Sequence, residues 1–240
     1  MTPPIVDVIT PTLNQADMTL ACLRSLSATV PARTSVRLIW IDNGSTTVDR
    51  YRVLAYLETE RIQHLRFWLP ENLGFVKGTN LGIAASTAPF LLLLNNDTEL
   101  PPMPGEDWLS RLLEVFELDP KIGLVGPRST SDQQWQGRVP TGQGYRVLAS
   151  NAMLAFFCCL IRRQVIEQVG YLSEEYRSGL GDDDDYCERA KRAGWKLALR
   201  EDVTVVHHHR TTFKAVYGAE ELQRYQQENL AHFRRKWRVK

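Results

Sequence analysis

The sequence predicts an α/β protein, with a mostly parallel central sheet flanked by helices and a more irregular second half. Two observations carry this prediction. Through the first hundred residues, short apolar runs alternate with segments of helical periodicity, and a short polar turn follows each apolar run. That order is typical of βαβ crossovers, which place successive strands parallel to one another. Beyond residue 100 the alternation gives way to a proline-rich connection and a long stretch rich in Gly, Ser and Gln.

The first half is expected to contain four strands and three helices. Strands are predicted over residues 5–10, 36–42, 64–69 and 89–95, where apolar residues predominate. Helices are predicted over residues 15–26, 48–59 and 75–86, because apolar or small residues recur there at helical spacing. The fourth strand contains the run LLLL, which suits a strand buried on both faces.

The second half combines helices, strands and one long loop. Helices are predicted over residues 108–119, 164–170 and 219–240, and residues 179–195 form a polar turn leading into another helix. Strands are predicted over residues 122–127 and 151–163 and within residues 196–210, with a long loop over residues 128–144. No internal repeat or clean domain boundary is found, so residues 1–240 are expected to form one domain.

The composition excludes some classes of protein. The 240 residues are 43% hydrophobic and 24% charged, as in an ordinary globular protein, and the net charge of +1 gives no reason to expect nucleic acid. The four cysteines form no C-x-x-C pair, so reduced thiols and a cytoplasmic location are expected. The N-terminus lacks a signal peptide, and the longest apolar run, residues 152–161, is about half the length of a membrane-spanning helix.

Polar groups follow each of the four strands predicted in the first half. They lie at residues 10–14, at Asp42 and Asn43, at Asn72 and Gly74, and at residues 95–99. Parallel strands bring these ends to one edge of the sheet, where ligands bind in open α/β folds. Asp42 suits hydrogen bonds to a base or ribose, or alternatively an Asx turn. Asp97 and Glu99 suit one Mg²⁺ or Mn²⁺ ion, with a plain polar turn as the alternative.

Two further clusters lie in the second half. Residues 182–185 are four aspartates at an expected helix start, where negative charge is favourable, so a helix cap is one interpretation. The other is a general base, because crowded carboxylates cannot all ionise freely and one pKa should rise. His207, His208 and His209 end a strand, where alternation puts the first and third on one face. A metal ligand and a structural role both fit them.

Several segments in a fixed order carry a resemblance to a known family. They are VDVITPTLNQADMTLACLRSL, IDNGST, ENLGFVKGTNLGI, LLLLNNDTEL, GLVGPR, FFCCLIRRQVIEQVGYLSE, GDDDDYCERAKRAGW and VTVVHHH. Together they make the chain resemble the family 2 glycosyltransferases, which use nucleotide-sugar donors and have the Rossmann-like GT-A fold. The resemblance covers about residues 5–213 and is strongest to the branch with rhamnosyltransferases and other polysaccharide-building enzymes. We therefore expect an inverting transfer of a hexosyl or deoxyhexosyl group to an acceptor hydroxyl.

The resemblance also implies roles for regions and residues. Residues 1–100 would form the nucleotide-sugar-binding half, residues 101–215 the metal and acceptor half, and residues 219–240 a C-terminal helix. The nucleotide-sugar site would include Pro11, Thr12, Asn14, Asp42, Asn72, Gly74, Asn80, Asn95 and Asn96. Mg²⁺ or Mn²⁺ would be bound by Asp97, which ends the D-x-D motif, and by His207, with Glu99 and His209 as alternative ligands. Asp183 would be the catalytic base, since it follows an acidic residue in the family's E-D-x-D motif.

The sequence departs from the family's pattern at two points. The D-x-D motif reads Asn95-Asn96-Asp97, so an amide replaces its first carboxylate and fewer charged metal ligands remain. Asp182 stands where glutamate is usual.

The expected partners are a nucleotide-diphosphate sugar and a saccharide or lipid-linked saccharide acceptor, in cell-surface polysaccharide or glycoconjugate synthesis. The terminal HFRRKWRVK is interpreted as a solvated helix end, or alternatively as a weak contact with the anionic inner face of a membrane. One rival function is a sugar-phosphate nucleotidyltransferase, but TPTLNQAD lacks a glycine- and basic-rich triphosphate loop. The other is a non-catalytic nucleotide-sugar-binding module, which both acidic clusters and the histidines disfavour.

Overall fold

The computed structural model describes residues 5–30, 35–60, 63–103, 107–132, 134–176, 180–208 and 211–238. The strands are β1 (Val6–Thr12), β2 (Val36–Asn43), β3 (Gln63–Leu69), β4 (Phe90–Leu94), β5 (Thr98–Glu99), β6 (Ile122–Ser129), β7 (Tyr145–Val147), β8 (Cys158–Arg162) and β9 (Lys196–His207). The helices are α1 (Ala16–Thr29), α2 (Thr47–Thr59), α3 (Phe75–Ala85), α4 (Trp108–Leu118), α5 (Trp135–Arg138), α6 (Arg163–Val169), α7 (Asp182–Arg192) and α8 (Thr211–Trp237).

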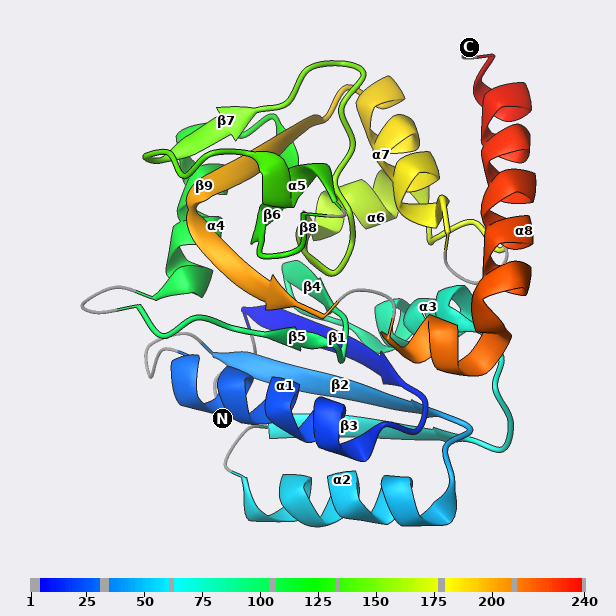
Figure 1. Ribbon diagram of the computed structural model, residues 1–240. Coiled ribbons are helices and arrows are strands. Elements are labelled where there is room, and N and C mark those ends of the chain that lie inside the picture. The colour runs from blue at the N-terminus through cyan, green and yellow to red at the C-terminus, as the bar shows by residue number, and fades with distance from the viewer. Residues whose placement is uncertain are drawn as a thin grey trace.

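The strands form one sheet in the order β3-β2-β1-β4-β8-β6-β9-β5, with β7 paired to β9 (Figure 1). Strands β3, β2, β1 and β4 are parallel, as the βαβ order predicts. Strand β8 then pairs antiparallel with both β4 and β6, and β6 pairs parallel with β9. The predicted α/β class is therefore confirmed, with the parallel arrangement concentrated in the first half.

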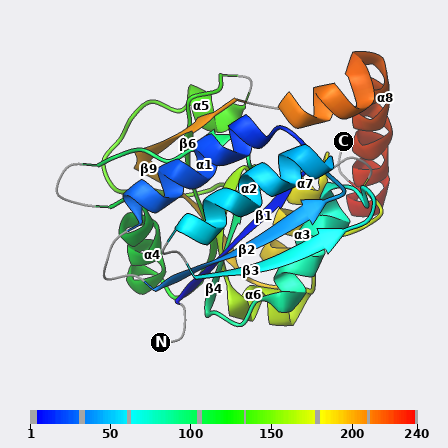
Figure 2. The ribbon, with the colours of Figure 1, turned by 90° about the horizontal axis from the view of Figure 1, so that it is seen from below.

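Helices cover both faces of the sheet, and Figure 2 shows α1 and α2 lying across one face of β1–β3. Apolar residues of α1, α2 and α4 form one core with the strands, and those of α3, α6 and α7 form the other. The leucines of β4 alternate between these cores, since Leu92 and Leu94 join the first and Leu91 and Leu93 the second. This burial on both faces confirms the prediction made from the LLLL run.

Three predicted boundaries differ from the structure. The apolar segment predicted as a strand from residue 151 becomes a strand only at Cys158, because Leu154 and Phe156 are buried in a non-strand conformation. The apolar composition correctly predicted that this segment is buried, but burial alone does not determine whether the backbone is in a strand. The predicted loop over residues 128–144 contains the end of β6 and the short helix α5. Helix α8 has a first segment from Thr211 that was not predicted and a kink at Gly218, whose φ of 72° is a left-handed value that glycine adopts readily, so its second segment begins where the helix over residues 219–240 was predicted.

The four cysteines all lie in the described part of the chain, and each has a free, buried thiol. Burial raises the pKa of Cys22 to about 12, so this thiol stays protonated near neutral pH. Every helix within the described ranges is too short or too polar to span a lipid bilayer.

Candidate active site

Two cavities meet beside the turn that follows β4. The larger has a volume of about 280 Å³ and the smaller about 60 Å³. Both are lined by Phe75, Asn95 and Asp97. The polar turn after the leucine strand therefore lies at the junction of two adjacent spaces, as expected for a ligand site at the carboxyl end of a sheet.

Asp97 and His207 face each other at this junction. The antiparallel pairing of β5 with β9 sets Thr98 opposite His207, 109 positions later in the chain, and so brings Asp97 close to His207. The Oδ1 atom of Asp97 lies 3.3 Å from Nε2 of His207, and both side chains are almost fully buried. Within the described part of the chain, no hydrogen-bond donor reaches this Asp97 oxygen.

This pair fits a divalent cation. Metal–ligand bonds of about 2.1 Å put neighbouring ligands of an octahedral site about 3 Å apart, close to the spacing of Asp97 and His207. Among the described residues no group of three or more His, Cys, Asp or Glu side chains could hold a metal. Asp97 and His207 would therefore be the protein's ligands, and water or a bound phosphate would supply the others.

Gln134 orients the imidazole of His207. Its Oε1 atom lies 3.0 Å from His207 Nδ1, and the ring of Phe157 stacks on the imidazole with centroids 4.7 Å apart. When Nδ1–H donates to the amide oxygen, the lone pair of Nε2 points toward Asp97, as a metal ligand requires. Sequence analysis missed Gln134, because nothing within the predicted loop distinguished it from its polar neighbours.

The other predicted metal ligands lie elsewhere. Glu99 pairs with His208 at 2.8 Å, and both side chains are about half exposed. His207 is the last residue of β9 and lines the larger cavity, whereas His208 follows the strand and does not line that cavity. His209 lies outside the described residues.

Three aspartates of α7 line the larger cavity. The helix begins after Gly181, which has no side chain to cap it, and within the first turn the Asp183 carboxylate accepts a hydrogen bond from the Asp184 amide at 2.9 Å, a contact that the helix-cap interpretation also expects. Burial and the adjacent carboxylates of Asp184 and Asp182 raise the pKa of Asp183 well above its usual value. Burial likewise raises the pKa of Asp182 to about 7, and that of Asp184 also rises. The cavity therefore contains three carboxyl groups whose pKa values are all raised, which is the direction of shift that a general base requires.

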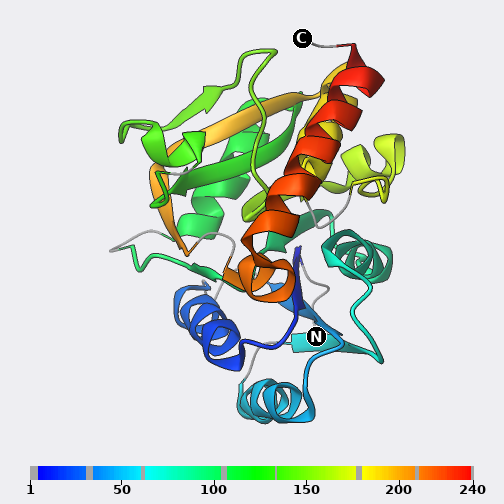
Figure 3. The same cartoon turned by 45° about the vertical axis from the view of Figure 1, so that its right-hand side comes forward.

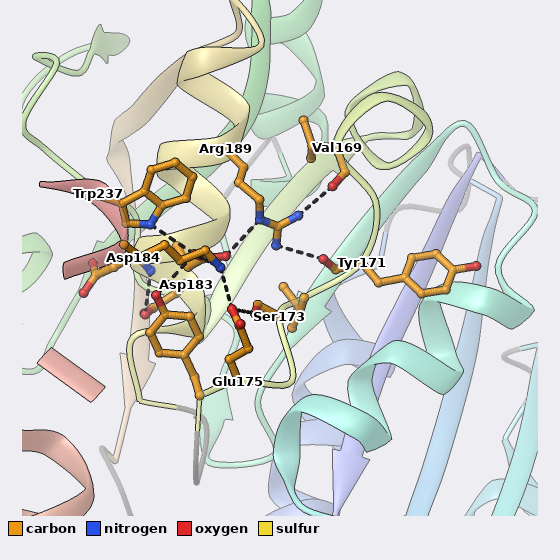
Figure 4. A network of polar contacts seen from close by, with 12 residues as sticks. Val169, Tyr171, Ser173, Glu175, Asp183, Asp184, Arg189 and Trp237 are labelled. Carbon is orange, nitrogen blue, oxygen red and sulfur yellow. Dashed lines mark hydrogen bonds and ion pairs between the residues drawn. The ribbon is translucent and has the colours of Figure 1, made fainter. Parts of the chain in front are cut away.

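Asp185 has a different role from its three neighbours. Its carboxylate is fully buried and pairs with Arg189 at 2.9 Å and Lys236 at 3.0 Å. It also accepts hydrogen bonds from Trp237 Nε1 at 3.0 Å and from Tyr176 Oη at 3.2 Å. Figure 4 shows Trp237 and Arg189 lying beside the first turn of α7, which contains Asp183 and Asp184. Asp185 thus ties α8 to α7 and does not line the cavity.

The smaller cavity contains most of the residues predicted for the nucleotide. From the predicted set, it is lined by Pro11, Thr12, Asn72, Asn95 and Asn96. Asp42 does not line it, and Asn43 does. The Asp42 carboxylate is fully buried, accepts hydrogen bonds from the Gly44 and Ser45 amides, and pairs with Arg50 at 3.1 Å. These contacts are those of the Asx-turn alternative for Asp42. Asn43, and not Asp42, therefore presents its side chain to the smaller cavity.

Three other predicted residues shape the site from outside both cavities. Asn14 has a φ of 52° and accepts a hydrogen bond from the Thr46 amide at 2.8 Å. Gly74 has a φ of 86° and precedes α3. Asn80 exchanges two hydrogen bonds of 3.0 Å with the backbone of Leu172, which joins α3 to the chain that precedes α7.

The second segment of α8 also forms part of the larger cavity. The lining residues from this helix are Gln226, Asn229, Leu230 and Phe233. Sequence analysis predicted the helix but not this contact, since the segment showed only a charged, amphipathic pattern. Figure 3 shows α8 running past the strands beside α7.

Comparisons with known proteins agree with this geometry. The family model described as Glycosyl transferase family 2 matches residues 7–170. Pre-mycofactocin glycosyltransferase from Mycobacterium tuberculosis is 28% identical over 235 residues, covering 89% of this chain and 46% of that protein. Glycosyltransferase AglE from Haloferax volcanii is 24% identical over 212 residues, covering 85% of this chain and 67% of that protein. The chain thus spans about half the length of the first of these relatives.

A solved structure shares the fold over the whole chain. It is the mannosyltransferase PcManGT from Pyrobaculum calidifontis in complex with GDP-Man and Mn²⁺, with a TM-score of 0.74 and 19% identity, covering 100% of this chain and 66% of that chain. This likeness supports the GT-A architecture. Since the family model matches well over half of the sequence, the chain belongs to glycosyltransferase family 2.

Proposed function

We propose that this chain transfers a hexosyl or deoxyhexosyl group from a nucleotide-diphosphate sugar to an acceptor hydroxyl, with inversion of configuration. One observation carries the proposal. Asp183, whose pKa is raised by burial, lines the same cavity as the Asp97–His207 pair. A candidate base and a candidate diphosphate site therefore face one space, in which a sugar can lie between them.

The donor would occupy both cavities. Its nucleoside would lie in the smaller one, among backbone and amide groups from the ends of β1, β2 and β3. Its diphosphate would lie at Asp97, where the cavities meet, and its sugar would extend into the larger cavity. The amide side chain of Asn95 lines both cavities and offers hydrogen bonds there without adding negative charge that would repel the phosphates.

The residues that fit a metal suggest how the leaving group is stabilised. Mg²⁺ or Mn²⁺ held by Asp97 and His207 would neutralise negative charge on the departing diphosphate. The Mn²⁺ in the structure of PcManGT supports this choice of ion. His207 is held in the required orientation by Gln134 and Phe157, so little rearrangement of the protein is needed.

Asp183 would act on the acceptor. As the acceptor oxygen forms its bond to the anomeric carbon, the bond from that carbon to the diphosphate oxygen breaks, and its electron pair stays with the diphosphate. The acceptor's proton passes to an Asp183 carboxylate oxygen. A single displacement inverts the anomeric carbon, and general-base help contributes about 10²–10⁴ in rate.

The wider role follows from the sequence resemblance. The branch that the motifs resemble supports a place in polysaccharide or glycoconjugate synthesis in the cytoplasm, with a saccharide or lipid-linked acceptor. A contact with the inner face of a membrane would rely on the exposed Arg234 and Arg235. Lys236 is engaged with Asp185 and Glu175, and Trp237 donates to Asp185, so these two are committed within the fold.

The test is the Asp183→Asn variant. It should release nucleoside diphosphate from a donor at least about 100-fold more slowly, because the amide cannot accept the acceptor's proton. Donor affinity and melting temperature should stay close to those of the wild type. A thermal-shift screen of nucleotide sugars with Mn²⁺, beginning with GDP-mannose, would identify the donor.

The matched variant is Asp182→Asn, which changes the neighbouring cavity carboxyl. It should keep most of the turnover. If Asp183→Asn turns over normally and Asp182→Asn does not, the base is Asp182. Pyrophosphate release from a nucleoside triphosphate and a sugar phosphate would instead indicate nucleotidyl transfer.

A further inference from the structure

The second segment of α8 presents one continuous face to the larger cavity. Gln226, Asn229, Leu230 and Phe233 follow the i, i+3, i+4, i+7 spacing of a single helical stripe, and all four line that cavity. Asp97 and His207 line the same cavity, and α7 contributes Asp183 to it. The four stripe residues line the larger cavity alone, whereas Val216 from the first segment of α8 borders the smaller one.

The stripe is fixed to α7 at both of its ends. Near its start, Asn229 Nδ2 donates to the Leu180 carbonyl at 2.7 Å, directly before the turn that begins α7. Beyond its end, Lys236 and Trp237 both contact the buried Asp185 carboxylate at 3.0 Å. Lys236 also pairs with Glu175 at 2.7 Å. These contacts hold the stripe at a set distance from Asp183, because both anchor points belong to α7 or to the turn before it.

The chemistry of this part of the cavity suits a sugar ring. Phe233 comes from α8, and Phe156 lines the same cavity from the segment before β8. Aromatic rings bind apolar surfaces such as the C–H face of a pyranose, and a few placed polar groups then fix its orientation. Gln226 supplies such a group from the helix, and Asp183 can accept a hydrogen bond from a hydroxyl.

We propose that α8 forms the acceptor subsite, with Phe233, Leu230 and Gln226 selecting a saccharide acceptor and orienting one of its hydroxyls toward Asp183. The inference rests on the proposed function, since it assigns the acceptor side of the same site. It makes the C-terminal helix a specificity element of the enzyme. The nucleotide part of the donor, placed in the smaller cavity, should be recognised without help from these three residues, because they line only the larger cavity.

The test compares Phe233→Ala and Leu230→Ala with Arg235→Ala. Leu230 is 47% exposed, so its truncation should leave the fold intact, and Arg235 is an exposed control on the same helix. Methyl glycosides of mannose, glucose, galactose and rhamnose serve as acceptor probes with an identified nucleotide-sugar donor. Donor affinity and release of nucleoside diphosphate to water are measured in parallel.

Phe233→Ala should raise the acceptor KM about tenfold, as expected for losing one stacked ring, and Leu230→Ala should raise it by less. Donor affinity and transfer to water should stay at wild-type levels in both variants, and Arg235→Ala should match the wild type throughout. An unchanged acceptor KM in both stripe variants would overturn the subsite. If the wild type uses none of the glycosides as acceptor while still releasing nucleoside diphosphate, the saccharide class is wrong. A failure of the proposed function looks different, because Asp183→Asn would then retain full turnover.

Discussion

Replacing Asp182 by asparagine should change how the stability of the fold depends on pH. The Asp182 side chain is 1% exposed, and its Oδ1 atom has no hydrogen-bond partner in the described part of the chain. Burial, followed by the charges of Asp184 and Asp185, raises its pKa from 3.8 to about 7. Ionising Asp182 therefore requires more free energy in the folded state than in the unfolded chain, where water solvates the carboxylate.

The sign and size of the effect follow from linkage. Because the folded-state pKa is the higher one, the folded protein binds more protons, and its free energy of unfolding falls as the pH rises. The loss begins near the unfolded pKa of 3.8 and is complete above the folded pKa of about 7. Between pH 5 and pH 7, two units at about 1.4 kcal/mol each amount to about 3 kcal/mol from this one group.

Urea unfolding at pH 5 and pH 8 measures the effect. The free energy of unfolding of the wild type should drop between these two pH values by about 3 kcal/mol more than that of Asp182→Asn. Any cost of burying the asparagine amide is the same at both values and cancels in the difference. Glu117→Gln, which changes an exposed carboxylate of α4, should follow the wild type. Parallel pH dependences of the wild type and Asp182→Asn would refute the reasoning, since Asp182 would then titrate alike in both states.

Two other changes test how the site and the sheet are built. Gln134→Leu should weaken Mn²⁺ binding in the presence of a nucleoside diphosphate by about tenfold or more, because the His207 ring loses the acceptor that orients it. Gln134→Glu keeps that acceptor and should retain binding in the same calorimetric titration, and equal affinities for all three proteins would exclude the orienting role. Gly82→Ala should lower the free energy of unfolding by about 1–3 kcal/mol, because the added methyl would lie 2.4 Å from Ile9 Cγ2 and 2.9 Å from Ile41 Cδ1. Urea unfolding checks this, and a change under about 0.5 kcal/mol would mean that α3 can move away from the sheet.

The local sequence pattern predicted the first half of the fold well, because the contacts there are mostly between elements that are neighbours along the chain. Each strand there is followed by the helix that covers it, so periodicity and polar turns carry most of the information. The same logic located Asp97, which directly follows a strand buried on both faces. Its partner His207 depends on the pairing of β5 with β9, a contact between distant segments that no local pattern encodes. The pairing was therefore not predicted, although three histidines at a strand end and the family resemblance both indicated His207 as a candidate metal ligand.

The residues that sequence analysis missed or misplaced depend on tertiary placement. Asn43 rather than Asp42 faces the smaller cavity because Arg50, one turn into α2, reaches back and buries the Asp42 carboxylate. Gln134 acquires its role only where the predicted loop crosses β9. Phe233 lines the larger cavity only because α8 packs beside α7 in the folded protein. In each case the deciding neighbour is set by the folded arrangement and not by spacing along the chain.

The amide at Asn95 has a consequence for how the proposed enzyme would use its metal. Asn95 is held by its backbone, since its N–H donates to the Phe157 carbonyl and its carbonyl accepts from Thr98 Oγ1 at 2.7 Å. Its side chain therefore lines both cavities from a fixed position, but it brings no charge to a cation. With Asp97 as the charged ligand and His207 as a neutral one, much of the attraction for a divalent ion must come from the diphosphate. By linkage, the nucleotide then raises the affinity for metal by the same factor as the metal raises the affinity for nucleotide. The two would bind as a unit at the junction of the cavities and leave as a unit after transfer, which ties metal occupancy to the presence of donor or product.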